Sequence, residues 1–148
     1  MKNLLVPIDG SSYSMQAVDK AKEIALAFKS NVVLVTVSEQ KSVDYPSSPY
    51  KFSQEQQAKA TVSLIEQKKK AQAVLDSAKT CLTGLPGRVD TVILEGNPAE
   101  MILEYANGHN IDLIVMGSKG MSGLQNLFIG SVTRRVALKT TRPILIVR

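Results

Sequence analysis

The sequence predicts a single-domain α/β protein with a doubly wound, five-stranded parallel sheet in the order 3-2-1-4-5. Five short apolar runs alternate along the chain with stretches whose apolar residues recur at helical spacing. Nearly continuous apolar runs are typical of strands buried on both faces, as in parallel sheets with helices on both sides. With 148 residues, 44% of them apolar, the chain has the size of one domain, so we expect residues 1–148 to form one core.

Each expected strand is one of these apolar runs. The runs are residues 4–8, 31–37, 88–96, 112–117 and 143–148. The run at 88–96 is half alternating, which indicates a place near an edge of the sheet. Right-handed crossovers between parallel strands make the fold doubly wound.

Four helices are expected between the strands. The first follows Asp9, where the serines at 11, 12 and 14 are N-cap residues, and a long one covers about residues 53–82. The third begins at Asn97-Pro98-Ala99-Glu100, with a cap residue, Pro at the first helical position and Glu three residues after the cap. The last covers about residues 131–139.

Charge and composition exclude several classes of protein. The net charge is +5, but the one dense basic cluster, Lys68 to Lys70, has no interleaved aromatic residues, so we expect a solvated helix face and no nucleic-acid partner. Cys81 is the only cysteine, which excludes an intramolecular disulfide and fits a reducing cytoplasm.

Asp9 interrupts the first apolar run before it reaches signal-peptide length, and no run approaches a membrane span of about 20 residues. A soluble, cytoplasmic protein is therefore expected.

A ligand site is expected at the carboxyl ends of the strands. In open α/β sheets ligands bind there, where the strand order reverses, and Asp9 and Gly117 each close a strand at that edge. The segment 45–52 carries two prolines in a connection too long for a tight turn. Either a lid over the site or a surface loop would account for it.

The segment GSKGMSGLQNLFIGSV, residues 117–132, has four glycines and leads from a strand to a helix. Glycine reaches positive φ without steric cost, and without Cβ it lets an anion approach backbone N–H groups. The following helix would add free N–H groups at its start. Ser131 and Thr133 would add hydroxyl groups that donate hydrogen bonds, and Lys119 would add a positive charge. A phosphate cradle and a closely packed structural turn both remain open from these residues. Gly130 is not followed by Lys, and the first turn reads DGSS, so neither a P-loop nor a dinucleotide fingerprint is present.

The glycine spacing carries a resemblance to a known family. Gly117-x-x-Gly120, nine residues, then Gly130-Ser131 resembles the nucleotide-binding pattern of the universal stress protein family, in its ATP-binding branch. The opening LLVPIDGS, the strand VVLVTV, the helix start GNPAE and the ending SVTRRVALKTTRPILIVR agree with it. The resemblance covers essentially the whole chain and favours the phosphate cradle.

The resemblance implies a binding site for ATP or another adenine nucleotide. The base would be bordered by the backbone at Pro7, Ile8 and Val37 and by Met116. Asp9 would hold the ribose or adenine side of the nucleotide. A carboxylate accepts ribose hydroxyls well; the alternative for Asp9 is a helix-start residue. With Lys119, the expected contact residues are Pro7, Ile8, Asp9, Val37, Met116, Gly117, Lys119, Gly120, Gly130, Ser131, Val132 and Thr133.

No catalytic residues are expected. His109, the only histidine, lies at a helix exit, and Cys81 lies near the end of a helix, where a core role is the default. Two kinds of function stay open: a nucleotide-binding stress-response module with an unknown downstream partner, and a slow ATP hydrolase or cyclic-adenine-nucleotide binder. No metal ligands are expected beyond Mg²⁺ held near Ser131 through phosphates.

A homodimer is expected through the last strand. The run from Pro143 to Arg148 is apolar on both faces and lies at an edge in the order 3-2-1-4-5. An unpaired apolar edge promotes aggregation unless it is covered. The same strand of a second copy would cover it, as the family resemblance also implies; a helix of the chain's own is the alternative.

Overall fold

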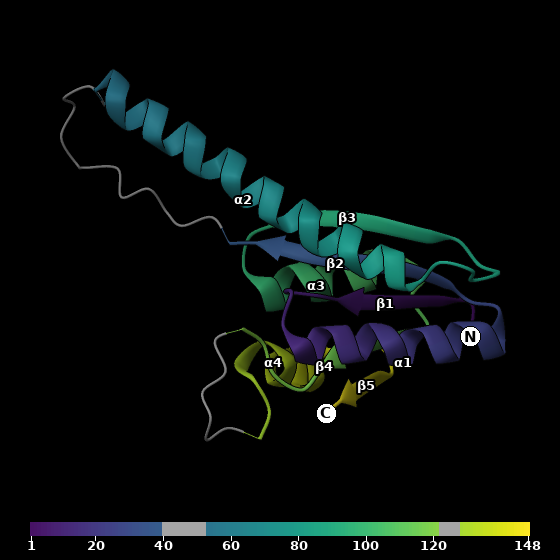
Figure 1. The fold of residues 1–148 in the computed structure, drawn as a ribbon. Helices are drawn as coiled ribbons and strands as arrows, with labels where there is room; N and C mark the ends of the chain where they lie inside the picture. Colours follow the sequence, from purple (N-terminus) through teal and green to yellow (C-terminus); the bar gives the residue numbers. More distant parts are fainter. Residues whose placement is uncertain (40–52, 122–127) are drawn as a thin grey trace.

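A computed structural model describes residues 1–39, 53–121 and 128–148 (Figure 1). The elements follow in strict alternation of strand and helix. They are β1 (Asn3–Pro7), α1 (Ser12–Phe28), β2 (Asn31–Ser38), α2 (Gln54–Cys81), β3 (Val89–Glu95), α3 (Pro98–Gly108), β4 (Leu113–Gly117), α4 (Ser131–Lys139) and β5 (Ile144–Val147). All strand pairs are parallel, and the order is β3-β2-β1-β4-β5. The predicted fold class and strand order are confirmed.

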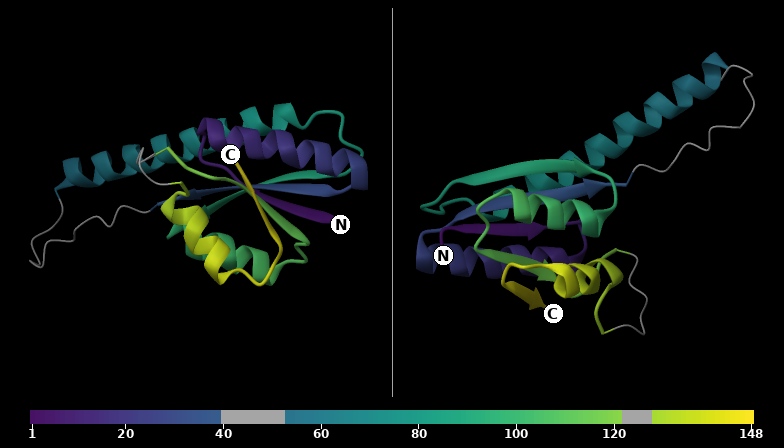
Figure 2. Two further views of the ribbon diagram at one scale, coloured as in Figure 1. Left: turned by 90° about the horizontal axis from the view of Figure 1, so that it is seen from below. Right: turned by 180° about the vertical axis from the view of Figure 1, so that it is seen from behind.

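Helices cover both faces of the sheet, α1 and α2 one face and α3 and α4 the other (Figure 2). Side chains alternate between the two faces along a strand, so β1 contributes to two cores. Leu4 and Val6 belong to the core under α1 and α2, and Leu5 to the core under α3 and α4. All three are fully buried, which explains why β1 is a continuous apolar run.

The two edge strands are less buried than the central ones. Every residue of β5 and nearly every residue of β3 is half-buried, whereas β4 is buried throughout. The half-alternating pattern at 88–96 therefore did indicate an edge.

Side-chain caps fix where the helices begin. Ser11 caps α1 by accepting a hydrogen bond from the N–H of Ser14, and Asn97 caps α3 by accepting one from the N–H of Glu100. The Glu100 carboxylate does not complete a capping box as the sequence suggested. It accepts a hydrogen bond from Arg135 at 2.7 Å and so joins α3 to α4.

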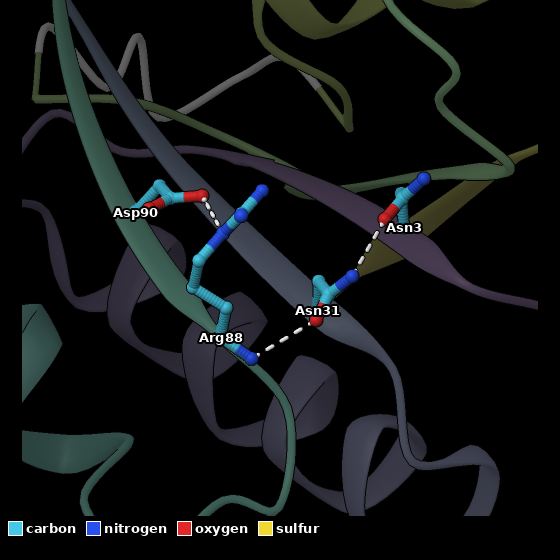
Figure 3. A network of polar contacts seen from close by, with 4 residues as sticks. All are labelled: Asn3, Asn31, Arg88 and Asp90. Carbon is cyan, nitrogen blue, oxygen red and sulfur yellow. Dashed lines mark hydrogen bonds and ion pairs between the residues drawn. The ribbon is translucent and has the colours of Figure 1, made fainter.

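A polar network holds the amino ends of three strands together (Figure 3). The side-chain amide of Asn31 donates to the side-chain oxygen of Asn3 at 3.0 Å, and its own oxygen accepts from the N–H of Arg88 at 2.9 Å. The Arg88 side chain reaches Asp90 at 2.7 Å. One asparagine thus bridges the starts of β1, β2 and β3 at the edge opposite the carboxyl ends.

Candidate functional site

A cavity of ≈ 340 Å³ lies at the carboxyl ends of the strands. It lies where the chain leaves β1 for α1 and β4 for α4, on either side of the point at which the strand order reverses. The loops of two neighbouring strands part there, which opens a crevice for a ligand. Its volume is within the range of about 300–1,000 Å³ typical of small-molecule pockets.

The structure brings all of the residues expected from the sequence to this one cavity. The lining includes Pro7, Ile8, Asp9, Val37, Met116, Gly117, Lys119, Gly120, Gly130, Ser131, Val132 and Thr133. It also includes residues that the sequence analysis missed, namely Ser14, Val35, Glu39, Pro98, Ile102 and Met121. Gly123, the third of the four glycines in GSKGMSGLQNLFIGSV, and the segment 45–52 lie outside the described residues.

One side of the cavity is the amino terminus of α4. Gly130 is its N-cap, and among the described residues no side chain caps it. The first N–H groups of a helix have no partner within the helix, and the positive end of its dipole lies beside them. Since Ser131, Val132 and Thr133 begin α4 and line the cavity, this side is suited to an anion.

The Thr133 side chain has a structural role on the same side. Its hydroxyl donates a hydrogen bond to the carbonyl oxygen of Gly117 at 2.8 Å, and the residue is buried. A hydroxyl has one hydrogen to donate. In this arrangement Thr133 therefore has its backbone N–H, and not its hydroxyl hydrogen, left for an anion.

The glycines of the loop make room for the chain itself. A Cβ at Gly117 would lie 2.6 Å from the backbone carbonyl atoms of Tyr13 in α1, and one at Gly120 would lie 2.6 Å from a carboxylate oxygen of Asp9. A Cβ at Gly130 would lie 3.3 Å from Cα of Lys119. Positive φ is not the reason for these glycines, because the described glycines with positive φ are elsewhere in the chain.

Asp9 joins the two loops that border the cavity. One carboxylate oxygen accepts from the N–H of Ser11 in the β1–α1 turn, and the other accepts from the N–H of Met121 after β4, both at 2.9 Å. The side chain is nevertheless exposed. A carboxylate has about four acceptor positions, so Asp9 retains acceptor capacity for a ligand.

Part of the cavity lining is apolar. Val35 and Val37 of β2, Met116 of β4, and Pro98 and Ile102 of α3 form this part. Two of them, Pro98 and Ile102, were missed because the sequence gives each another explanation. Pro98 is at the first position of a helix, and Ile102 belongs to the apolar face of that helix. A signal was available, because a helix that follows β3 begins at the same edge of the sheet as the cavity.

Three lining side chains carry charge. They are the carboxylates of Asp9 and Glu39 and the ammonium group of Lys119, whose Nζ lies 5.9 Å from the ring centroid of Tyr13. Among the described residues of the lining, carboxylates thus outnumber cations. In residues 1–39, 53–121 and 128–148, no group of three or more His, Cys, Asp or Glu residues could hold a metal ion.

Two ionisable groups with displaced pKa values lie outside the cavity. Hydrogen bonds from the backbone N–H groups of Asn3 and then Lys2 lower the pKa of Asp112. Burial, and after it the Asp90 carboxylate, raises the pKa of Tyr105. His109 stacks on Tyr105 with ring centroids 3.9 Å apart, at the helix exit where the sequence placed it.

Cys81 and the basic cluster are placed as the sequence indicated. Cys81 ends α2 and is packed against the core under α1 and α2. Lys68, Lys69 and Lys70 are exposed on α2, and Lys68 lies 3.9 Å from Glu95. In the described part of the chain, no helix has both the length and the apolar character that a membrane span requires.

The fold and the cavity define a class, the doubly wound α/β proteins with a cavity at the switch point of the sheet. The model of the universal stress protein family matches residues 1–148, and the chain belongs to this family. A universal stress protein of Thermus aquaticus is 35% identical over 99% of this chain and 98% of its own.

Solved structures share the fold. The universal stress protein UspA from Lactobacillus plantarum matches with a TM-score of 0.83 and 23% identity, over 99% of this chain and 97% of its own. A universal stress protein solved in complex with cAMP matches with a TM-score of 0.72 and 26% identity, over 99% of this chain and 97% of its own.

Proposed function

We propose that this universal stress protein binds an adenine nucleotide, with ATP as the principal ligand, and acts as a nucleotide-dependent module in a stress response. The observation that carries the proposal is the cavity itself. It combines a helix terminus that no described side chain caps with a group of apolar lining residues. A phosphate chain suits the first and a base the second. A relative of the same fold, 26% identical, was solved with cAMP.

Each part of the ligand then has a stated partner. Pro7, Ile8, Val37 and Met116 border the adenine ring, and Asp9 accepts hydrogen bonds from the ribose hydroxyls. The phosphates lie against Gly117, Gly120 and Gly130 and accept hydrogen bonds from the backbone N–H groups of residues 131–133, with Lys119 as the flexible counter-charge. All of these residues line the cavity. The N–H of Gly130 itself donates to the carbonyl oxygen of Ser118.

We propose that ATP is bound with Mg²⁺. The charged side chains of the described lining are two carboxylates and one ammonium group, a poor match for a bare triphosphate. A divalent cation near Ser131, bound through the phosphates, would reduce that mismatch. No described residue of the lining is a histidine, and Asp9, one of its two carboxylates, already accepts hydrogen bonds from two backbone N–H groups. We therefore favour a regulatory module over a slow ATP hydrolase, and a binder of cyclic adenine nucleotides is the second candidate.

Thermal unfolding tests the binding proposal. A ligand at about 100 times its dissociation constant stabilises the native state by about 2.7 kcal/mol, so ATP with Mg²⁺ should raise the melting temperature, and NAD should raise it less. Gly130→Val, which places a β-branched side chain at the entrance to α4, should remove at least about 1.4 kcal/mol of this binding energy, a tenfold loss. If ATP, ADP, AMP and cAMP all leave the melting curve unchanged, the proposal is wrong. Mass spectrometry of small molecules released from the denatured protein would identify a resident nucleotide.

We further propose a cytoplasmic homodimer formed through β5. The strand is at the end of the sheet, and all its residues are half-buried. Leu145 and Val147 pack against the core under α1 and α2, and Ile144 against the other core. Ile146→Lys should therefore abolish the dimer with less damage to the fold than a change at the other three. A mass near 16 kDa for the unchanged protein, by light scattering at micromolar concentration, would refute this dimer.

A further inference from the structure

The amino-terminal half of α2 extends beyond the other helices and strands that the structure describes (Figure 1). The buried residues of this helix, Leu75 and Ala78, are both in its last third, and residues 54–70 include none. That segment rises about 25 Å along the helix axis. Most of the stability of a protein helix comes from packing of one of its faces, so packing against another surface would stabilise this segment.

An apolar stripe runs along the projecting segment on the side away from the body. Val62 and Ile65 have 54% and 49% of their surface exposed, and Ala58 is four residues before Val62 on the same side. At about 100° per residue, Val62 lies about 160° around the helix from the buried Ala78. Leu64, which is 51% exposed, lies instead on the side that continues the buried face.

The charges beside this stripe are self-complementary. Lys59 and Glu66 are both exposed, and each directly follows an apolar residue of the stripe, Ala58 and Ile65. They therefore lie along the same flank, one heptad apart. When two identical helices pack antiparallel, this flank of one meets the same flank of the other, and Lys59 of each copy meets Glu66 of the other.

We propose that residues 54–70 of α2 form a docking surface for the same segment of a second copy of this chain, packed antiparallel about a two-fold axis. Val62 of each copy packs against Ile65 of the other, and two Lys59–Glu66 pairs flank this centre. A parallel arrangement would instead bring the clusters of Lys68, Lys69 and Lys70 from both copies together, which like-charge repulsion disfavours.

The extent of the projecting segment fits this arrangement. In the register that places Val62 opposite Ile65, the axis passes beside residues 63 and 64, near the middle of residues 54–70. The helix packs on the core from Val74 and Leu75 onwards, and before them the exposed side chain of Lys68 lies 3.9 Å from Glu95. Antiparallel pairing therefore centres on the part of α2 that has no buried residue.

The contact is short, which sets its strength. A standard protein–protein interface buries about 1,600 Å² of surface, and a pair of helical segments about 25 Å long buries less. The association through α2 should therefore be weak on its own. It is separate from β5, which lies at the far edge of the sheet from β3 and α2. A chain with two such two-fold contacts forms assemblies larger than a dimer, or dimers when either contact is lost.

Sedimentation velocity over a range of protein concentrations tests the proposal on the full chain. Val62→Asp places a charge in the centre of the contact and should weaken the concentration-dependent association at least about tenfold. Leu64→Asp is the matched control, since Leu64 has the same exposure on another side of the helix. It should leave the association unchanged. The comparison is made between variants, so a β5 dimer that is present in all of them does not affect it.

Charge reversal tests the antiparallel register. Lys59→Glu and Glu66→Lys should each weaken association, because each puts like charges together across the axis. The double variant Lys59→Glu/Glu66→Lys should restore it. Within one helix, Glu55 can pair with Lys59 and Glu66 with Lys70, and the double change does not restore these pairs. If the double variant regains association, the regained contact is therefore the one between copies.

Three results would overturn the proposal. They are a sedimentation profile that does not depend on concentration, equal effects of Val62→Asp and Leu64→Asp, and a double charge-reversal variant no better than the single ones. Circular dichroism of each variant checks that α2 is still helical, and all these positions are exposed, so the fold is expected to survive. Nucleotide binding is measured in parallel and should be the same in every variant.

Discussion

The hydroxyl of Thr133 donates a hydrogen bond to the carbonyl oxygen of Gly117 across 2.8 Å, joining the first turn of α4 to the last residue of β4. Both residues are buried, so this bond replaces water at a carbonyl that closes a central strand. This bond holds together the two ends of the connection from β4 to α4. A second bond does the same, because the N–H of Gly130 donates to the carbonyl oxygen of Ser118 at 2.7 Å.

Thr133→Val should destabilise the protein by about 1–3 kcal/mol, because the near-isosteric side chain leaves the buried carbonyl of Gly117 without its donor. Thr133→Ser keeps the hydroxyl and should cost less. Urea unfolding of both variants without ligand gives the comparison. Equal stability of the two would mean that this bond contributes nothing to the fold.

Gly117 and Gly130 should respond differently to the same change. Gly117→Ala forces a Cβ to 2.6 Å from the Tyr13 carbonyl, which only a backbone movement can relieve, so we expect about 1–3 kcal/mol of destabilisation. At Gly130 the nearest atom is 3.3 Å away, and a small adjustment suffices. Thermal unfolding without nucleotide should therefore separate them. A Gly130→Ala protein as unstable as Gly117→Ala would refute this account of the loop.

Asp112 should make stability depend on pH in the acid range. Hydrogen bonds from the N–H groups of Asn3 and Lys2 lower its pKa below the ordinary value of 3.8. Because the pKa is lowered in the native state, the stabilisation is fully present above the ordinary pKa of 3.8. It is lost as the pH falls through the lower, native pKa. Asp112→Asn should therefore lower stability at about pH 7 and lower it less at about pH 3. Because Asp112 is exposed, the effect should be small. A loss that is the same at both pH values would contradict this explanation.

The sequence predicted most of the fold because its signals were local. Continuous apolar runs marked β1, β2, β4 and β5, and the Asn97-Pro98 cap marked the first residue of α3. The partner of Glu100 was wrong, because the position of Arg135 on α4 depends on how two helices pack across the sheet face.

The site was predicted less completely than the fold. Loop and strand-end residues were found, but Pro98 and Ile102 line the cavity only because α3 begins over the same edge, and Glu39 only because β2 ends there. The glycine spacing predicted the close approach of a phosphate, which stays a prediction. It did not show that at Gly117 the approaching group is the carbonyl of Tyr13, because α1 meets β4 only in three dimensions.

Asp9 offers the sharpest test of how a nucleotide is oriented. Asp9→Ala should weaken ATP and AMP by a similar factor, about tenfold or about 1.4 kcal/mol, because both ligands have the ribose hydroxyls that the carboxylate accepts. The change also removes the acceptor for the N–H of Met121, so part of the loss could come from a displaced loop. Dideoxy-ATP, which lacks both hydroxyls, separates the two effects. If Asp9 holds the ribose, isothermal titration should show that Asp9→Ala weakens ATP much more than dideoxy-ATP, a coupling that a loop displacement would not produce. Equal losses for the two ligands would assign Asp9 to the loop alone, and tighter ATP binding in Asp9→Ala would place its carboxylate beside the phosphates, where it repels them.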